Sequence, residues 1–182
     1  GIEHQYDKLI VATGRRAFIP SDVRLDLPGR FTMRERNDAD RLKHYLQETG
    51  LPNEQQHVVI VGGGLLGLEL AAALKKKEVN ISIIQRAPRL MERQLDLVAS
   101  RLLAEDVEDR GIQIFFDNEV STVFEGKEGK NILNVGLKTG RTLSCNAIVY
   151  AIGTRPNIDI LKEAGLITRR GVIVDPYLTT SN

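Results

Sequence analysis

This sequence of 182 residues has a single cysteine, a net charge close to zero and no long apolar run. With Cys145 as the single cysteine, an intramolecular disulfide and a Cys/His metal site are excluded. No apolar run approaches the roughly 18 residues that span a bilayer, and no signal peptide pattern opens the chain. A formal net charge of +1 provides no field that would recruit nucleic acid or an anionic membrane. These absences predict a cytoplasmic protein whose partner is a small molecule.

The centre of the sequence instead contains a strand, a glycine-rich turn and a helix in direct succession. Val58–Val61 is a β-branched run typical of a strand buried on both faces, and Leu65–Leu74 is rich in helix formers. Val79–Ile84 follows as a second strand. This βαβ order predicts a doubly wound, Rossmann-like α/β domain with a parallel sheet.

Three glycines in this turn have the G-x-G-x-x-G spacing of dinucleotide-binding sites. Gly62 allows the tight turn, Gly64 lets the backbone approach a pyrophosphate, and Gly67 lets the helix lie close to the strand. The anion would lie at the helix N-terminus, where unpaired N–H groups and the helix dipole favour it. The competing interpretation is a glycine turn that binds no ligand.

The remaining helices and strands are predicted from the periodicity of apolar residues and from the glycines that separate the segments. Short segments separated by glycines predict a three-stranded antiparallel meander within the nucleotide-binding domain. The predicted elements are a strand at Tyr6–Ala12, a helix at Arg36–Gln47 capped by Asn37 or Asp38, a helix at Leu95–Arg110 that buries Leu95, Val98, Leu102, Leu103 and Val107, a strand at Ile112–Phe116, meander strands at Glu119–Phe124, Ile132–Leu137 and Arg141–Leu143, and a strand at Ala147–Ala151.

Four segments together resemble the flavin-dependent pyridine nucleotide:disulfide oxidoreductase superfamily. In order they read Y-D-K-L-I-V-A-T-G, V-V-I-V-G-G-G-L-L-G-L-E, A-I-G-T-R-P-N and G-V-I-V-D-P-Y-L-T-T-S. In that superfamily an NAD(P)H domain is inserted into a FAD domain. The resemblance therefore implies that residues 1–30 end the first FAD-domain segment, residues 31–155 form the NAD(P)H-binding domain, and residues 156–182 connect to the second FAD-domain segment.

The same resemblance implies a fragment of an NAD(P)H-dependent FAD oxidoreductase. Gly1 is not an initiator methionine, and the flavin glycine motif is expected upstream, so FAD belongs to the full-length protein and is not expected in this fragment. L-M-E-R-Q-L-D at Leu90–Asp96 and F-T-M-R-x-x-x-D-A-D-R-L at Phe31–Leu42 are most similar to the large subunit of assimilatory NAD(P)H nitrite reductase. A rubredoxin or ferredoxin reductase, an NADH oxidase-type flavoprotein and a non-catalytic NAD(P)H-sensing module are the alternatives, and a homodimer stays open.

No catalytic residue is assigned, but the resemblance gives four residues a place near the cofactors. Glu69 would approach the nicotinamide or the flavin side, or would equally stabilise the helix dipole. Leu65, followed by Leu66, stands where many relatives carry an aromatic gate over the flavin. Gly153 would give backbone access at a strand end, with a structural turn as the rival interpretation.

Cofactor choice is expected to depend on the end of the second strand. NAD-specific folds place Asp or Glu there to bind the ribose diol, whereas this sequence has Gln85. The amide can bind a ribose hydroxyl without repelling a 2′-phosphate, and Arg86 with Arg89 could pair that phosphate. Gly67 instead favours NADH, because NADP-preferring relatives often have alanine at this position. We therefore expect NAD(P)H, while the alternative for both arginines is exposed loop charge.

Overall fold

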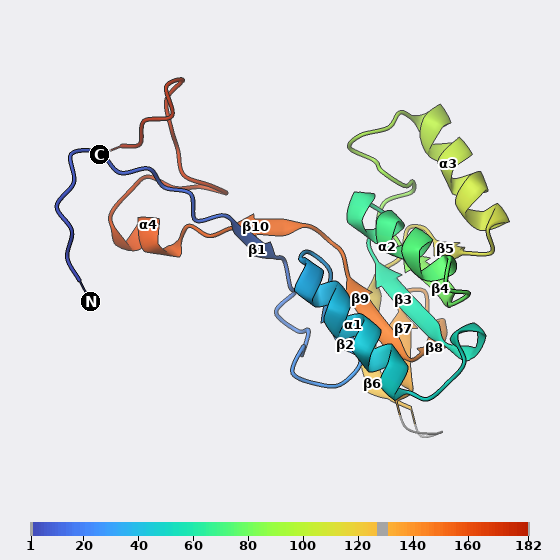
Figure 1. Cartoon of the computed structure of the whole chain (residues 1–182). Coiled ribbons are helices and arrows are strands. Elements are labelled where there is room, and N and C mark those ends of the chain that lie inside the picture. The colour runs from blue at the N-terminus through green and yellow to red at the C-terminus, as the bar shows by residue number, and fades with distance from the viewer. Residues whose placement is uncertain (1, 127–130, 182) are drawn as a thin grey trace. The chain divides into compact units, whose positions relative to one another are not determined.

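The computed structural model describes residues 2–126 and 131–181 (Figure 1). The chain divides into two units, one formed by residues 19–153 and the other by residues 1–18 with residues 154–182. The first unit contains the predicted glycine turn.

A five-stranded sheet forms the centre of residues 19–153, with the strand order β2-β9-β3-β4-β5. All four pairings in the sheet are parallel. This arrangement confirms the predicted Rossmann-like parallel sheet. The strands are β2 (Arg30–Thr32), β3 (His57–Val61), β4 (Asn80–Ile84), β5 (Gln113–Phe115) and β9 (Ala147–Tyr150).

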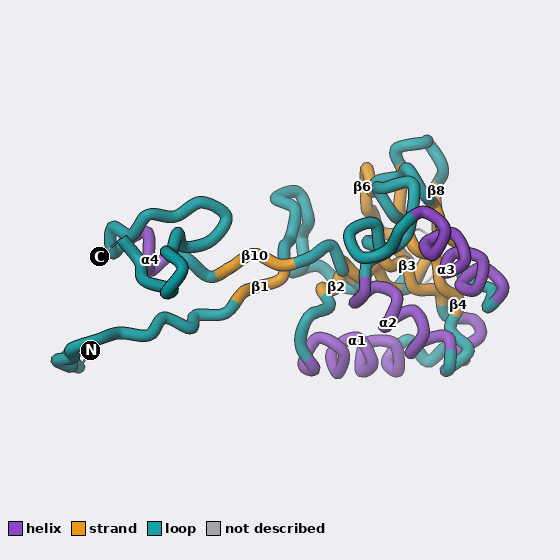
Figure 2. Tube along the Cα trace, turned by 90° about the horizontal axis from the view of Figure 1, so that it is seen from above, coloured by secondary structure: helices purple, strands orange, loops and turns teal. Residues whose placement is uncertain are grey.

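Three helices cover one face of this sheet: α1 (Arg36–Glu48), α2 (Leu65–Lys75) and α3 (Leu97–Asp109). Figure 2 shows α1 and α2 on one side of the strands and β6 with β8 on the other. The connections through the helices all run across the sheet in the same direction, from β2 towards β5. Because parallel crossovers are right-handed, connections with a common direction place their helices on a common face.

The opposite face is covered by an antiparallel meander of β6 (Val120–Glu125), β7 (Leu133–Leu137) and β8 (Thr142–Cys145). The meander lies within the connection from β5 back to β9, which crosses the sheet in the reverse direction. A right-handed crossover then has to pass over the other face. The predicted meander is confirmed, and it forms the second layer, on the face of the sheet that the helices leave uncovered.

Side chains along the central strands alternate between two apolar clusters. Val58 and Ile60 of β3 pack with the helices, whereas Val59 packs with the meander, and all three side chains are fully buried. Successive residues of a strand point to opposite faces, so a strand covered on both faces is apolar throughout. This explains why the continuous apolar run at this position predicted a buried strand correctly.

Two predictions about helices need correction. The N-cap of α1 is Glu35, and Asp38 is instead the third helical residue of a capping box, where its carboxylate accepts the backbone N–H groups of Arg34 and Glu35. In α3 the predicted buried residues Val98 and Leu102 are 60% and 57% exposed.

The buried stripe of α3 is rotated relative to the prediction and runs through Ser100, Leu103, Ala104 and Val107. The Ser100 hydroxyl donates to the backbone oxygen of Leu90 at 2.7 Å, so a polar side chain is buried without losing its hydrogen bond. Serine and alanine are small, which allows the helix to approach the sheet closely on this side. Because two of the buried residues are small or polar, counting apolar residues assigns the exposed face of α3, with Val98 and Leu102, to the core.

The other unit contains β1 (Arg15–Ala17) paired antiparallel with β10 (Thr154–Pro156), and the short helix α4 (Asp159–Glu163). The strand predicted at Tyr6–Ala12 is wrong, because these residues have no strand structure. A strand requires a hydrogen-bonded neighbour, and no described residue pairs with this segment. Its Ile10 is 89% exposed. A 3-10 turn at Asn53–Gln55 completes the elements.

Candidate nucleotide-binding site

The glycine turn follows the carboxyl end of β3, next to the carboxyl end of β9. Gly62 has φ +112°, a conformation that favours glycine, and its N–H donates to the backbone oxygen of Ile84 at 2.8 Å. A Cβ added to Gly62 would lie 2.7 Å from the backbone oxygen of Ala151. The turn therefore fits against β9 only as long as this position has no side chain.

The other two motif glycines differ in what surrounds them. A Cβ at Gly67 would overlap the backbone oxygen of Gly62, so this glycine allows α2 to contact the turn closely. A Cβ at Gly64 would meet nothing within 4 Å. The structure thus gives Gly67 the packing role that its spacing predicts, and leaves the space in front of Gly64 open on the side where a pyrophosphate is expected.

The N-terminus of α2 lies at this open space. Gly64 is the N-cap residue, and it contributes no side chain to cap the helix. The first turn contains no acidic residue. The first N–H groups of a helix have no partner within the helix, and here no carboxylate offsets the positive end of the helix dipole. This end of α2 can therefore donate to an anion.

Gly153 lies beyond the same edge of the sheet. It follows β9 with φ +104°, and a Cβ there would meet nothing within 4 Å. The connection that follows β3 crosses towards β4, whereas β9 lies on the other side of β3. Ligands of open α/β sheets bind beyond the carboxyl ends of neighbouring strands whose connections leave in different directions. The structure brings Gly153 and the glycine turn to the carboxyl ends of these two neighbouring strands.

The residues at the start of α2 have separate environments. Leu65 is 57% exposed beside the turn, whereas Leu66 packs against the apolar cluster beneath the helices. Glu69 is exposed and has no ion-pair partner among the described residues. Leu66 therefore packs against the hydrophobic core, while Leu65 and Glu69 remain accessible to a ligand.

The side chain of Gln85 is turned towards the protein backbone. It accepts the N–H of Gly63 at 2.8 Å and donates to the backbone oxygen of Arg89 at 3.0 Å. The residue is 9% exposed. Sequence reasoning missed Gly63, although it stands in a run of three consecutive glycines that the motif spacing does not require.

The two candidate phosphate-binding arginines are not equivalent. The Arg86 side chain is 84% exposed, and its Nε lies 3.7 Å from a carboxylate oxygen of Glu119. Arg89 is half-buried and donates to the backbone oxygen of Glu92 at 3.0 Å. Arg86 is therefore free to reorient towards an anion, whereas Arg89 is engaged within its own loop.

Burial explains the two strongly shifted pKa values of the sheet region. It raises the pKa of the Cys145 thiol to about 12, and it raises the pKa of the Tyr150 hydroxyl to about 12. Cys145 is thus protonated at neutral pH and buried, so it is not a reactive thiol. The part of the chain that the structure describes holds no group of three potential metal ligands.

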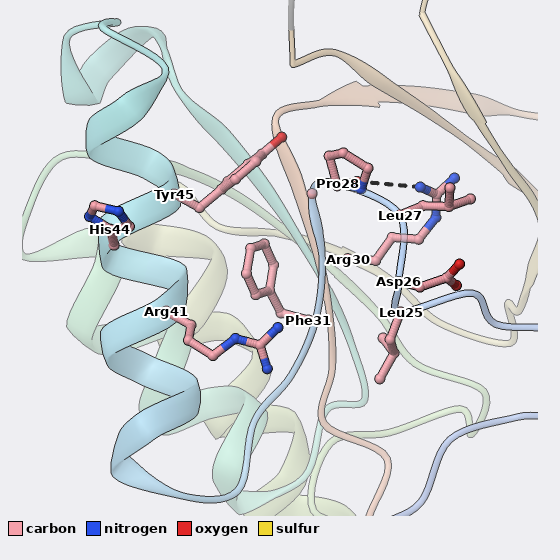
Figure 3. A pocket seen from close by; sticks show the side chains of 10 residues that line it. Leu25, Asp26, Leu27, Pro28, Arg30, Phe31, Arg41, His44 and Tyr45 are labelled. Carbon is pink, nitrogen blue, oxygen red and sulfur yellow. Dashed lines mark hydrogen bonds between the residues drawn. The ribbon is translucent and has the colours of Figure 1, made fainter.

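A hollow of about 310 Å³ lies between α1 and the segment before β2. Figure 3 shows the side chains that line it. It is lined by Leu27, Pro28 and Arg30 on one side and by Arg41 and Tyr45 of α1 on the other. The Arg30 guanidinium donates to the backbone oxygen of Pro28 at 3.3 Å. Because this hollow lies where β2 begins, it is at the amino end of an edge strand. Ligands of open α/β sheets bind beyond carboxyl ends, so the candidate site is the glycine turn and not this hollow.

Comparison with known proteins agrees with this geometry. A family model described as pyridine nucleotide-disulphide oxidoreductase matches residues 1–182. The chain belongs to this family. Its relatives include an NAD(P)H-dependent reductase, and the resemblance inferred from the four sequence segments is confirmed.

Two curated relatives come from Bacillus subtilis (strain 168). The NAD(P)H nitrite reductase is 33% identical over 175 residues, which cover 96% of this chain and 21% of the relative. The assimilatory nitrate reductase electron transfer subunit is 32% identical over 176 residues, which cover 97% of this chain and 22% of the relative. The chain therefore spans about a fifth of the length of each.

A solved structure shares both fold and sequence with the chain. The ferredoxin reductase for the CYP199A2 system of Rhodopseudomonas palustris superposes with a TM-score of 0.82 and is 29% identical, covering 93% of this chain and 40% of that one. Among the described residues, no helix is long and apolar enough to cross a membrane.

Proposed function

We propose that this chain is the NAD(P)H-binding part of a flavoprotein reductase that serves nitrite reduction. The observation that carries the proposal is the glycine turn at the carboxyl ends of the neighbouring strands β3 and β9. There, Gly64 leaves open space in front of an uncapped helix N-terminus. When bound, NAD(P)H supplies a hydride to FAD, which the full-length protein would hold.

The residues of the chain would orient the dinucleotide without taking part in bond changes. The free N–H groups at the start of α2 would bind the pyrophosphate, with Gly64 giving it access to the backbone. Leu65 and Gly153 would line the path towards the nicotinamide, and Glu69 would face it from α2. Gly62 and Gly67 would hold the turn in this shape through their close packing.

The unit of residues 1–18 and 154–182 would belong to a FAD domain completed by other parts of the full-length protein. Its exposed apolar side chains support this proposal: Ile10 is 89% exposed and Tyr177 is 88% exposed. Large apolar side chains exposed in this number usually contact another surface. A neighbouring strand there would also give Tyr6–Ala12 the pairing partner that the predicted strand requires.

The test has two levels. Calorimetric titration of the chain with NADH and with NADPH should show one site, and absence of binding for both would refute the assignment. For the full-length protein, mixing with NAD(P)H in a stopped-flow spectrometer should bleach flavin absorbance, and added nitrite should then be consumed. Flavin reduction without nitrite consumption would favour the second candidate, a ferredoxin reductase, which the solved relative at 29% identity supports.

A further inference from the structure

The segment from Gln85 to Met91 holds both backbone groups of Gly63. Oε1 of Gln85 accepts the Gly63 N–H at 2.8 Å, and the backbone oxygen of Gly63 accepts the N–H of Met91 at 3.0 Å. Nε2 of Gln85 donates to the backbone oxygen of Arg89 at 3.0 Å, which closes the segment on itself. One side chain thus connects the glycine turn to the loop that follows β4.

Packing restrains the same contact. A Cβ on Gly63 would lie 2.5 Å from Cδ2 of Leu90 and 3.3 Å from Oε1 of Gln85. Leu90 is fully buried, and its backbone oxygen accepts the Ser100 hydroxyl of α3 at 2.7 Å. The segment therefore cannot shift independently, because it is fixed to α3 as well as to the turn.

We propose that Gln85 is a positioning residue that fixes the glycine turn for pyrophosphate binding, and that it does not select between NADH and NADPH. The inference rests on the proposed function. Gly63 presents a donor and Arg89 presents an acceptor, so the bridging side chain needs one acceptor and one donor on the same group. A glutamine amide supplies both, whereas a carboxylate would place a second acceptor against the Arg89 carbonyl oxygen. Discrimination at the 2′-position then falls to the exposed Arg86.

The experiment compares wild type with Gln85→Met, which keeps the side-chain length but removes both hydrogen bonds. Dissociation constants are measured for NADH, NADPH, ADP-ribose and adenosine. We expect about a tenfold weakening of the three pyrophosphate ligands, with the NADH/NADPH ratio unchanged within about twofold and adenosine unaffected. Gln113→Met, at an exposed position of β5, is the matched control and should leave all four constants unchanged.

The outcomes separate this inference from the proposed function. If wild type binds none of the three pyrophosphate ligands, the proposed function falls. If wild type binds them, three results for Gln85→Met would refute the positioning role. These are unchanged dissociation constants, weaker binding of only one of NADH and NADPH, and weaker binding of adenosine by the same factor as the pyrophosphate ligands. Should Gln85→Met fail to fold, Gly63→Ala provides the second test, since its methyl group displaces Leu90 and the turn from the other side. It should give the same uniform loss, and retention of wild-type constants would overturn the inference.

Discussion

Replacing Gly64 by valine should abolish nucleotide binding while preserving the fold. Gly64 has φ −90° and ψ −175°, an extended conformation that β-branched residues adopt readily. An added Cβ would meet no atom within 4 Å. The new side chain would therefore extend into the space in front of the α2 N-terminus, where the pyrophosphate is expected.

The two effects differ in size. Valine is a poorer N-cap residue than glycine, which should cost about 1 kcal/mol or less in the free energy of unfolding. Exclusion of the pyrophosphate would remove at least two charge-assisted hydrogen bonds from backbone N–H groups, each contributing about 1.5–3 kcal/mol. The resulting loss of about 3–6 kcal/mol corresponds to at least a hundredfold increase in the dissociation constant.

Isothermal titration calorimetry gives the dissociation constants, and urea unfolding gives the stability. Gly171→Val is a matched control, because a Cβ there also meets nothing within 4 Å but the residue lies in the other unit. It should bind NADH as wild type does. A folded Gly64→Val variant with wild-type affinity would show that the open space is not the pyrophosphate site.

Four further outcomes are expected. Arg86→Ala should weaken NADPH by about 1–3 kcal/mol and leave NADH nearly unchanged in paired titrations, and an equal effect of Arg93→Ala would contradict a specific contact. Gly67→Ala should lower the free energy of unfolding, since its Cβ overlaps the Gly62 backbone oxygen, and unchanged urea stability would refute that packing. Burial lowers the pKa of His57, so the unfolded state binds a proton more readily than the folded state. The free energy of unfolding should therefore fall as the pH drops below about 6.5, the ordinary pKa of histidine. Urea titrations across this range should show that His57→Gln removes the effect. Finally, the purified chain should bind NAD(P)H without FAD, and stoichiometric co-purification of yellow flavin would disprove this.

The predicted core of the domain was correct wherever local chemistry and tertiary packing required the same residues. The apolar run at Val58–Val61, the glycine spacing and the helix formers after it together indicated β3, the turn and α2. The resemblance to the family came from the same residues and was confirmed. Each of these signals is short in range, because a tight turn needs glycine and a doubly covered strand needs apolar residues on both faces.

Long-range contacts decided what the sequence pattern left open. The buried face of α3 depends on Ser100 reaching the backbone of Leu90, and apolar periodicity contains no trace of such a bond. The segment at Tyr6–Ala12 has strand-forming residues but no pairing partner among the described residues. A strand is defined by its neighbour, so its residue types are insufficient.

The candidate site shows the same division. Spacing identified Gly62, Gly64 and Gly67 as candidates, but the positioning role that we propose for Gln85 rests on atoms of Gly63 and Arg89 that only the folded chain brings within hydrogen-bond distance. The side-chain amide of a glutamine at a strand end can form hydrogen bonds with a ribose hydroxyl or with a backbone group, and the residue type does not distinguish the two. Which of the two it meets depends on where the following loop passes, and that path is set by burial of Leu90 in the core.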